Sequence, residues 1–343
     1  MGRSTVYNNI CTPELYNQVC QDNKDLLDEF VEYLKSTDKS PKTIDSYIGD
    51  IKICFIWNLQ SNKNKEFTDF NKRDIMKYQN YLMNELNVGS SRVRRLKASI
   101  SSMSNFIESV LDEDFPKFKN IVNKIPAPIK QTVRLKTVIT EEQLQSLFDY
   151  LIENKKYQQA CVLALAVASG ARKSELLRFK VSYFKDEYIK YGALYKTPEL
   201  VKTKGRSSKG KLIYKWTLVS KFKPYFDLWM EEREKLGIDS DELFMVTRKG
   251  VLKSMDITTL DSWAITFSKI LEVDFYWHSL RHFFTTSLCK ANIPAEIIKD
   301  IVGWESVTMI ATYNDTEVDE EIGKYFDENG VKEVEKKSLT DLK

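Results

Sequence analysis

Histidine, cysteine and long apolar runs are scarce in this sequence. Two histidines among 343 residues exclude a histidine-rich metal centre. The five cysteines are scattered without a Cys-x-x-Cys pair, which argues against a disulfide scaffold or a structural zinc site and favours a reducing compartment. No apolar run approaches the roughly 20 residues that span a bilayer, and residues 1–8 lack the apolar segment of a secretory signal. A cytoplasmic protein is therefore expected.

Charge is unevenly distributed along the chain. Hydrophobic residues make up 42% and charged residues 29% of the sequence, a composition typical of folded domains, and the length suffices for two of them. Residues 314–343 hold ten acidic and five basic residues, a net charge of −5. Because the whole chain has a net charge of +3, the rest of it carries +8. A basic body indicates a polyanionic partner, whereas the acidic tail is equally consistent with a solubility segment.

The first third of the chain has the apolar periodicity of a small helical bundle. Residues 1–21 are polar and aperiodic and are interpreted as an extension. Four amphipathic helices are predicted within residues 22–125: over 24–35, after Ser40-Pro41, after Thr68-Asp69, and from Gly89 to Val110. Short links between amphipathic helices favour an all-α bundle.

The last of these helices begins with basic residues and no acid. Positive charge opposes the helix macrodipole at this end, so phosphate contacts explain it better than helix stabilisation does. A solvated basic face is the alternative. A proline-containing linker follows at residues 126–136, with further bases that suit a chain lying across DNA. The candidate DNA contacts are Arg92, Arg94, Arg95, Lys97, Lys130, Arg134 and Lys136, together with Lys202 and Arg206.

Helices and a small hairpin are predicted for residues 137–330. Thr140 followed by two glutamates opens a helix, and the almost wholly apolar residues 158–169 predict a buried one. Strand-like runs on both sides of residues 204–210 predict a β-hairpin, and helical patterns dominate from 221 to 328. These residues are expected to form a mixed α/β domain, with 331–343 as a polar tail.

Two stretches of this domain carry residues suited to phosphate chemistry. Arg172 follows the end of the buried helix at Gly170, and Glu175 stands three residues further on. Gly170 is interpreted as a helix C-cap that needs a positive φ. The hairpin supplies Lys202 and Lys204, and Lys204 is preferred because it precedes the turn, where a hairpin tip reaches DNA.

Two further stretches follow near the end of the domain. His278 and Arg281 are three residues apart and therefore share one face of a helix. Trp304 follows Gly303, a second C-cap candidate, and Tyr313 comes nine residues after the tryptophan. Each stretch alone also suits an ordinary structural role, such as a core tyrosine or a helix-start arginine.

In combination and in order, these residues resemble the tyrosine recombinase family, also called phage integrases, and its simple Cre/Xer-like members. The family pattern is an arginine with an acid three residues on, a hairpin lysine, a His-x-x-Arg box, a second His or Trp, and a nucleophilic tyrosine. It falls on Arg172, Glu175, Lys204, His278, Arg281, Trp304 and Tyr313. The resemblance implies a mainly α fold, with an N-terminal four-helix, SAM-like core DNA-binding domain and a C-terminal mixed α/β catalytic domain with a small β-hairpin sheet.

The implied reaction cleaves and rejoins DNA strands through a covalent 3′-phosphotyrosine, with no metal, ATP or other cofactor. Two arginines hold the non-bridging oxygens, and Tyr313 is the nucleophile. Lys204 protonates the leaving 5′-oxygen, and His278 moves protons or holds the phosphate. Glu175 orients a neighbour from behind the site, and Trp304 supports it by donation, because an indole N–H accepts no proton.

The implied partners are double-stranded DNA with a paired inverted-repeat core site and further copies of the chain in a synaptic homotetramer. A C-terminal helix would be donated to the neighbouring protomer, or would pack on its own domain; its apolar face comprises Val318, Ile322, Tyr325 and Phe326. Such a protein is expected with the nucleoid in the cytoplasm. A type IB topoisomerase-like enzyme and a catalytically modest DNA-binding regulator are the alternatives, and integration, excision, inversion and resolution all stay open.

Overall fold

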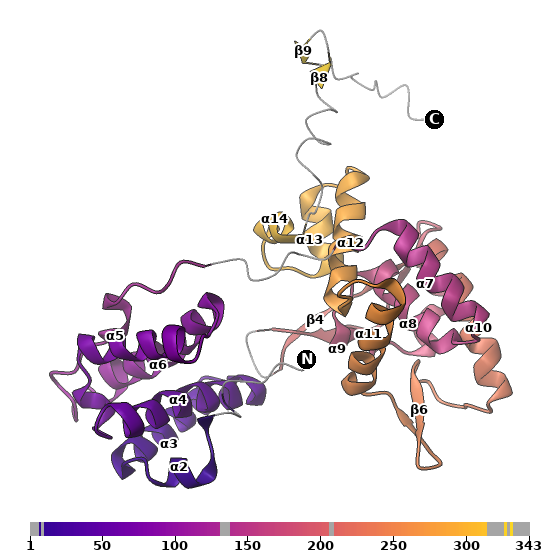
Figure 1. Cartoon of the computed structure of the whole chain (residues 1–343). Helices are drawn as coiled ribbons and strands as arrows, with labels where there is room; N and C mark the ends of the chain where they lie inside the picture. Colours follow the sequence, from indigo (N-terminus) through magenta and orange to yellow (C-terminus); the bar gives the residue numbers. More distant parts are fainter. Residues whose placement is uncertain are drawn as a thin grey trace. The chain divides into compact units, whose positions relative to one another are not determined.

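The chain folds into two compact units in a computed structural model that describes Tyr7, residues 10–130, 138–205 and 209–313, and the backbone of 326–327 and 330–331 (Figure 1). One unit comprises Met1–Leu135 with Lys204–Lys211, and the other Lys136–Thr203 with Leu212–Lys343. The predictions for Arg134, Lys136, Arg206, Val318, Ile322 and Tyr325 lie outside the described residues.

The first unit is the predicted bundle of amphipathic helices. Its helices are α2 (Pro13–Asn17), α3 (Gln21–Ser36), α4 (Pro41–Ser61), α5 (Lys72–Asn80), which continues into a π-helical turn η2 (Tyr81–Glu85), α6 (Ser90–Val110), and the 3₁₀ turns η1 (Phe67–Asp69) and η3 (Val122–Lys124). The four predicted helices are α3 to α6. Their starts follow local capping chemistry: the Ser40 hydroxyl accepts from the Thr43 amide ahead of Pro41, as expected at an N-cap.

Residues 1–21 are not simply an extension. Within them α2 forms behind the N-cap Thr12, and Ile10 and Val19 lie in the core of the first unit with less than a tenth of their surface exposed. The few apolar residues of this polar stretch form too short a pattern for their burial to be predicted. The same core holds Phe30, Trp57 and Ile100 of the longer helices.

Most of the second unit is helical. Its helices are α7 (Glu141–Glu153), α8 (Tyr157–Ser169), α9 (Lys173–Leu176), α10 (Val219–Lys235), α11 (Ile257–Leu271), α12 (Trp277–Lys290), α13 (Ala295–Val302), α14 (Ile310–Tyr313), and the 3₁₀ turns η4 (Val181–Phe184), η5 (Asp186–Tyr188) and η6 (Val307–Met309). The predicted buried helix is α8, whose residues from Ala160 to Ser169 are all buried and which packs against α7, α10 and α12. Helix α8 is thus the centre about which the others are arranged.

Short antiparallel sheets complete the second unit. Strands β1 (Ile189–Lys190), β2 (Leu194–Lys196) and β5 (Trp216–Leu218) form one sheet in the order β1-β2-β5, with Tyr195 opposite Thr217. The predicted hairpin is the pair β3 (Val201–Thr203) and β4 (Lys211–Ile213). In the chain, the hairpin therefore lies between β2 and β5 of the sheet.

A second hairpin interrupts the region in which helical patterns were expected to dominate. Strands β6 (Met245–Arg248) and β7 (Val251–Ser254) pair around Lys249 and Gly250, both of which have positive φ, a turn suited to a tight hairpin. Most of its side chains are exposed, so the sequence lacks the alternation that identifies a half-buried strand.

The C-terminal segment departs from the predicted helix at one residue. Phe326 lies in β8 (Phe326–Asp327), which pairs with β9 (Gly330–Val331), so the prediction that Phe326 belongs to a helix is wrong. Here Phe326 pairs with Val331 across the two strands instead of continuing the helical spacing. Among the described residues, no helix is long and apolar enough to cross a membrane.

Candidate active site

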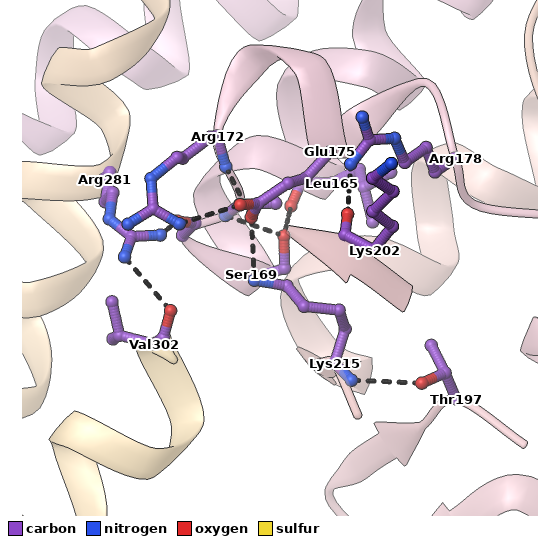
Figure 2. A network of polar contacts seen from close by, with 12 residues as sticks. Leu165, Ser169, Arg172, Glu175, Arg178, Thr197, Lys202, Lys215, Arg281 and Val302 are labelled. Carbon is purple, nitrogen blue, oxygen red and sulfur yellow. Dashed lines mark hydrogen bonds and ion pairs between the residues drawn. The ribbon is translucent and has the colours of Figure 1, made fainter. Parts of the chain in front are cut away.

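Arg172 is positioned by the end of the central helix. Helix α8 stops at Gly170, whose φ of 56° is left-handed as predicted, and Arg172 is the N-cap of α9. The Arg172 amide donates to Glu175 Oε2 at 3.0 Å, and its guanidinium donates to Glu175 Oε1 at 2.8 Å (Figure 2). The Arg172 side chain keeps 25% of its surface exposed, so it reaches solvent although its main chain and guanidinium are both bonded to Glu175.

Arg281 occupies the interior of the same site. Its side chain is fully buried, with one terminal nitrogen donating to Gly170 O at 2.8 Å and the other to Val302 O at 3.0 Å (Figure 2). Both carbonyls stand at the C-terminal ends of helices, α8 and α13, where positive charge is favoured. Burial and then the neighbouring charge of Arg172 lower the pKa of Arg281 to about 10.

Tyr313 contacts the histidine of the His-x-x-Arg box directly. His278 Nε2 and Tyr313 Oη are 2.9 Å apart, which is a hydrogen bond. His278 stands one turn before Arg281 on α12, and Tyr313 ends α14 with 7% of its surface exposed. Residues 35 positions apart in the chain thus meet as an imidazole and a phenol hydroxyl.

Aromatic side chains enclose the tyrosine ring. The Trp304 ring lies 4.9 Å from it between centroids, and the His282 ring 4.5 Å away at an interplanar angle of 27°. Trp304 follows Gly303, whose φ of 78° makes it the second predicted C-cap. The Arg281 guanidinium lies 5.7 Å from the Tyr313 ring centre, within the range of a cation–π contact. His282 is therefore packed on the candidate nucleophile.

The two candidate hairpin lysines lie on β3 and directly after it. Lys202 is exposed on β3 between buried Val201 and Thr203, and Lys204 follows the end of that strand. Lys204 belongs to the segment that groups with the first unit. Two residues apart on an extended chain, both lysines project to the same side of the hairpin, so either can serve the role proposed for a hairpin lysine.

Lys215 is a site residue that the sequence analysis did not identify. It directly precedes β5, none of its surface is exposed, and its ammonium donates to Glu175 Oε2 at 3.0 Å. Burial alone would raise the pKa of Glu175, but the charges of Lys215 and Arg172 outweigh it and lower that pKa to about 2. The position of this lysine inside the mostly apolar residues 212–219 is the feature of the sequence from which its burial could have been predicted.

In the first unit, the basic start of α6 has an internal countercharge. The carboxylate of Asp50 on α4 is buried and pairs with Arg92 at 2.7 Å and with Arg95 at 3.3 Å. Arg94 is exposed and donates to Pro128 O at 3.0 Å, and Lys130 is exposed as well. Asp50 therefore offsets part of the charge that was assigned to phosphate.

Lys97 is a structural residue, which corrects its assignment as a DNA contact. Only 5% of the Lys97 surface is exposed, and its ammonium donates to Gln79 Oε1 and to Ile125 O, each at 2.7 Å. Both partners lie within the first unit, so the charge is satisfied internally rather than presented to a phosphate. Its position on the buried face of α6, beside Leu96 and Ile100, explains the difference.

Comparisons with known proteins agree with this arrangement. The phage integrase family matches residues 137–320, and the N-terminal SAM-like domain of phage integrases matches residues 26–117. The chain is 30% identical over 256 residues to the SPβ prophage-derived recombinase-like protein YomM of Bacillus subtilis, which covers 74% of this chain and 73% of that protein.

Two more distant similarities extend over most of the chain. Tyrosine recombinase XerD of Oceanobacillus iheyensis is 22% identical over 301 residues, 84% of this chain and 92% of that protein. The structure of a lambda integrase tetramer bound to a Holliday junction superposes with a TM-score of 0.62 at 18% identity, covering 85% of this chain and 77% of that chain. The second similarity is one of fold.

Proposed function

The chain belongs to the phage integrase family, the tyrosine recombinases, and we propose that it cleaves and rejoins DNA at a specific site through a covalent 3′-phosphotyrosine on Tyr313. The observation that carries this proposal is the 2.9 Å hydrogen bond between His278 Nε2 and Tyr313 Oη, beside two arginines. A nucleophilic hydroxyl, a base within reach and cationic donors are the parts that transfer to phosphorus requires.

The arginines act on the phosphate. Attack on a phosphodiester adds negative charge to its non-bridging oxygens, and guanidinium groups stabilise this charge with short, charge-assisted hydrogen bonds. Arg172, held at one end by Glu175, presents the exposed guanidinium. Arg281 uses two of its five N–H donors on main-chain carbonyls, so further donors are left for an oxygen that enters the site.

Protons move through His278 and a hairpin lysine. As the Tyr313 oxygen bonds to phosphorus, its proton passes to His278 Nε2, and the bond from phosphorus to the 5′-oxygen breaks. Lys204, or Lys202 in its place, supplies the proton of the leaving 5′-hydroxyl. Attack of a 5′-hydroxyl on the phosphotyrosine reverses these steps and restores the phosphodiester, so rejoining consumes no ATP.

The proposed substrate is double-stranded DNA with a paired inverted-repeat core site, bound by the chain as a tetramer in the compartment that holds DNA. A tetramer of lambda integrase on a Holliday junction shares this fold, which supports the assembly. The C-terminal segment from Val318 to Phe326 is the proposed link between protomers. Arg94 and Lys130 of the first unit and the hairpin lysines are the proposed phosphate contacts.

A covalent-adduct assay tests the proposal. Cells that carry the candidate mobile DNA express wild type, Tyr313→Phe or, as a matched control, Tyr225→Phe on α10; lysis in denaturant is followed by sequencing of the DNA attached to the protein. Adducts at one sequence in wild type and Tyr225→Phe, absent from Tyr313→Phe, are expected. Tyr225 stacks on Phe148 away from the site, so loss of its hydroxyl leaves the chemistry unchanged.

Three results would count against the proposal. A surviving adduct in Tyr313→Phe would move the nucleophile to another residue. Sequence-selective DNA retention without any adduct in wild type would favour a DNA-binding regulator, whereas DNA relaxation without recombination of paired sites would favour a topoisomerase-like enzyme.

A further inference from the structure

A fully buried ion pair lies directly behind the phosphate-facing arginine. None of the surface of the Lys215 and Glu175 side chains is exposed, and Lys215 Nζ and Glu175 Oε2 are 3.0 Å apart. The two residues are 40 positions apart, one before β5 and one in α9, so only the tertiary fold brings them together (Figure 2). The main chain of Lys215 is fixed as well, since its amide donates to Thr197 Oγ1 at 3.0 Å.

Burying such an ion pair costs folding free energy, so its presence suggests a function beyond stability. Moving an ammonium and a carboxylate out of water costs several kcal/mol for each ion, so replacement by apolar residues is often neutral or stabilising. Here the buried cation also lies close enough to Arg172 and Arg281 that their charges, after burial itself, help to lower its pKa. The surroundings of Lys215 therefore disfavour its charge, except for the single contact with Glu175.

The bonds at Glu175 are divided between its two oxygens. Oε2 accepts from the Lys215 ammonium and from the Arg172 amide, whereas Oε1 accepts from the Arg172 guanidinium. Arginine and a carboxylate otherwise favour a two-bond fork that uses both oxygens. With Oε2 already occupied, the guanidinium of Arg172 makes one carboxylate bond among the described residues, and its other N–H donors stay available.

We propose that Lys215 is a positioning residue of the active site, which holds Glu175 so that Arg172 is anchored by one bond and points its remaining donors at the scissile phosphate. This inference rests on the proposed function and adds a residue to it. Lys215 itself is fully buried, so it touches no substrate and differs in role from the hairpin lysine.

The formal charges support this role. Arg172, Arg281 and Lys215 against Glu175 make a cluster of net charge +2 when Lys215 is protonated. A phosphodiester carries one negative charge and gains a second as an oxygen attacks it, so the cluster matches the transition state better than the ground state. Without Lys215 the cluster is one charge short, and Glu175 is free to take Arg172 in a two-bond fork.

The first test measures phosphate binding and needs no DNA site. The unfolding temperature is compared in sodium phosphate and in sodium chloride of equal ionic strength, because a ligand that binds the folded state raises it. The variants are Lys215→Met, Arg172→Ala and, as the matched control, Lys223→Met, whose ammonium pairs with Asp227 on the exposed face of α10. Wild type and Lys223→Met are expected to gain stability in phosphate, and Lys215→Met and Arg172→Ala are expected to lose that gain.

The second test measures adduct formation per molecule of bound DNA, at the sequence identified by the adduct assay. Lys215→Met should slow it by about tenfold or more, less than the roughly 10²–10³ that loss of a direct donor costs. Lys223→Met should stay within about twofold of wild type, inside the range of neutral surface substitutions. All rates are taken at a temperature at which each variant is folded.

A double-mutant cycle separates positioning from simple loss of stability. Glu175→Gln removes the carboxylate through which Lys215 acts, so Lys215→Met should cost less in the Glu175→Gln background than in wild type. This comparison also serves if Lys215→Met fails to fold alone, since the double variant leaves neither member of the Lys215–Glu175 pair charged without its partner. Equal costs of Lys215→Met in the two backgrounds would overturn the proposal.

The outcomes for the two proposals are distinct. Wild-type adducts together with an unchanged rate in Lys215→Met would overturn the role of Lys215 and leave the recombinase intact. Absence of wild-type adducts would count against the proposed function, while loss of the phosphate gain in Lys215→Met would still support Lys215 as the residue that positions Arg172.

Discussion

At the scale of the residue, the two arginines of the site differ in what holds them. Arg281 is wholly buried between the carbonyls of Gly170 and Val302, whereas Arg172 is partly exposed and anchored by one carboxylate. A guanidinium that satisfies two buried carbonyls contributes to folding, in addition to the catalytic role proposed for it. The sequence pattern alone assigns both arginines the same role.

Their alanine variants should therefore behave differently. Arg281→Ala leaves buried acceptors without donors, at roughly 1–3 kcal/mol for each unsatisfied group, and should lower both the urea midpoint and the rate of adduct formation. Arg172→Ala should lower the rate by about 10²–10³ with a smaller loss of stability. Urea unfolding and adduct rates on the same preparations provide the check; equal losses of stability would contradict the distinction.

Glu175 makes stability depend on acid pH. Its folded-state pKa is about 2 against an ordinary value of 4.5, because Lys215 and Arg172 outweigh the effect of burial. A depressed pKa stabilises the fold above the ordinary value and loses this contribution as pH falls through the folded value. Between these two pH values, the urea midpoint of wild type should fall more steeply than that of Glu175→Gln. Glu231→Gln, at an exposed position of α10, is the control and should follow wild type.

At the scale of the element, two left-handed glycines end the helices that carry the site. Gly170 ends α8 and Gly303 ends α13, and a Cβ at Gly170 would lie 2.4 Å from the Phe284 ring. At Gly303 the Cβ would meet the flexible tip of Ile213 at 2.2 Å, and at Gly237 nothing lies within 4 Å although φ is +63°. The rigid ring leaves the least room for adjustment.

Alanine at these glycines should destabilise in a fixed order. Gly237→Ala should cost only the strain of a left-handed residue, about 1–2 kcal/mol. Gly303→Ala should cost more, and Gly170→Ala most, because the Phe284 ring cannot rotate away as a methyl tip can. Gly170→Ala should also slow adduct formation, since Arg172 and the Gly170 carbonyl move with the helix end. Urea unfolding of the three variants tests the order, which a larger loss at Gly237 would refute.

Elements were predictable where the local pattern is strong. The periods of α3 to α6, the apolar run of α8 and the capping box of Thr140 and Gln143 at α7 are local properties of the chain. The hairpin of β6 and β7 and the helix α2 were missed, because exposed strands and a five-residue helix carry little periodicity. The strand at Phe326 overrode a helical spacing for the same reason: two residues are too few for a pattern.

At the scale of the whole molecule, the acidic tail opposes a basic body. Deleting residues 316–343 removes the proposed link between protomers together with most of the tail's negative charge. DNA binding by the monomer should persist, and non-specific binding should strengthen and depend more steeply on salt, since like charge near the phosphates is removed. Tetramer formation on paired sites should weaken.

Native gels and sedimentation of the protein–DNA complexes measure both effects. A variant with Glu317, Asp319, Glu320 and Glu321 changed to their amides keeps the apolar residues, so it separates charge from packing. If the deletion variant forms tetramers as wild type does, the interpretation that the tail packs on its own domain is favoured instead.

Sequence alone singled out Arg172, His278, Arg281 and Tyr313 as candidates and predicted the glycines that end two of the helices, because order along the chain and local backbone geometry are enough for these. Only the tertiary structure decided that Lys215 joins Glu175, that Asp50 neutralises part of the basic start of α6, and that Lys97 is buried. These contacts link residues 18 to 45 positions apart. Their energies come from burial and from the loss of solvent screening around charges, which no local spacing encodes.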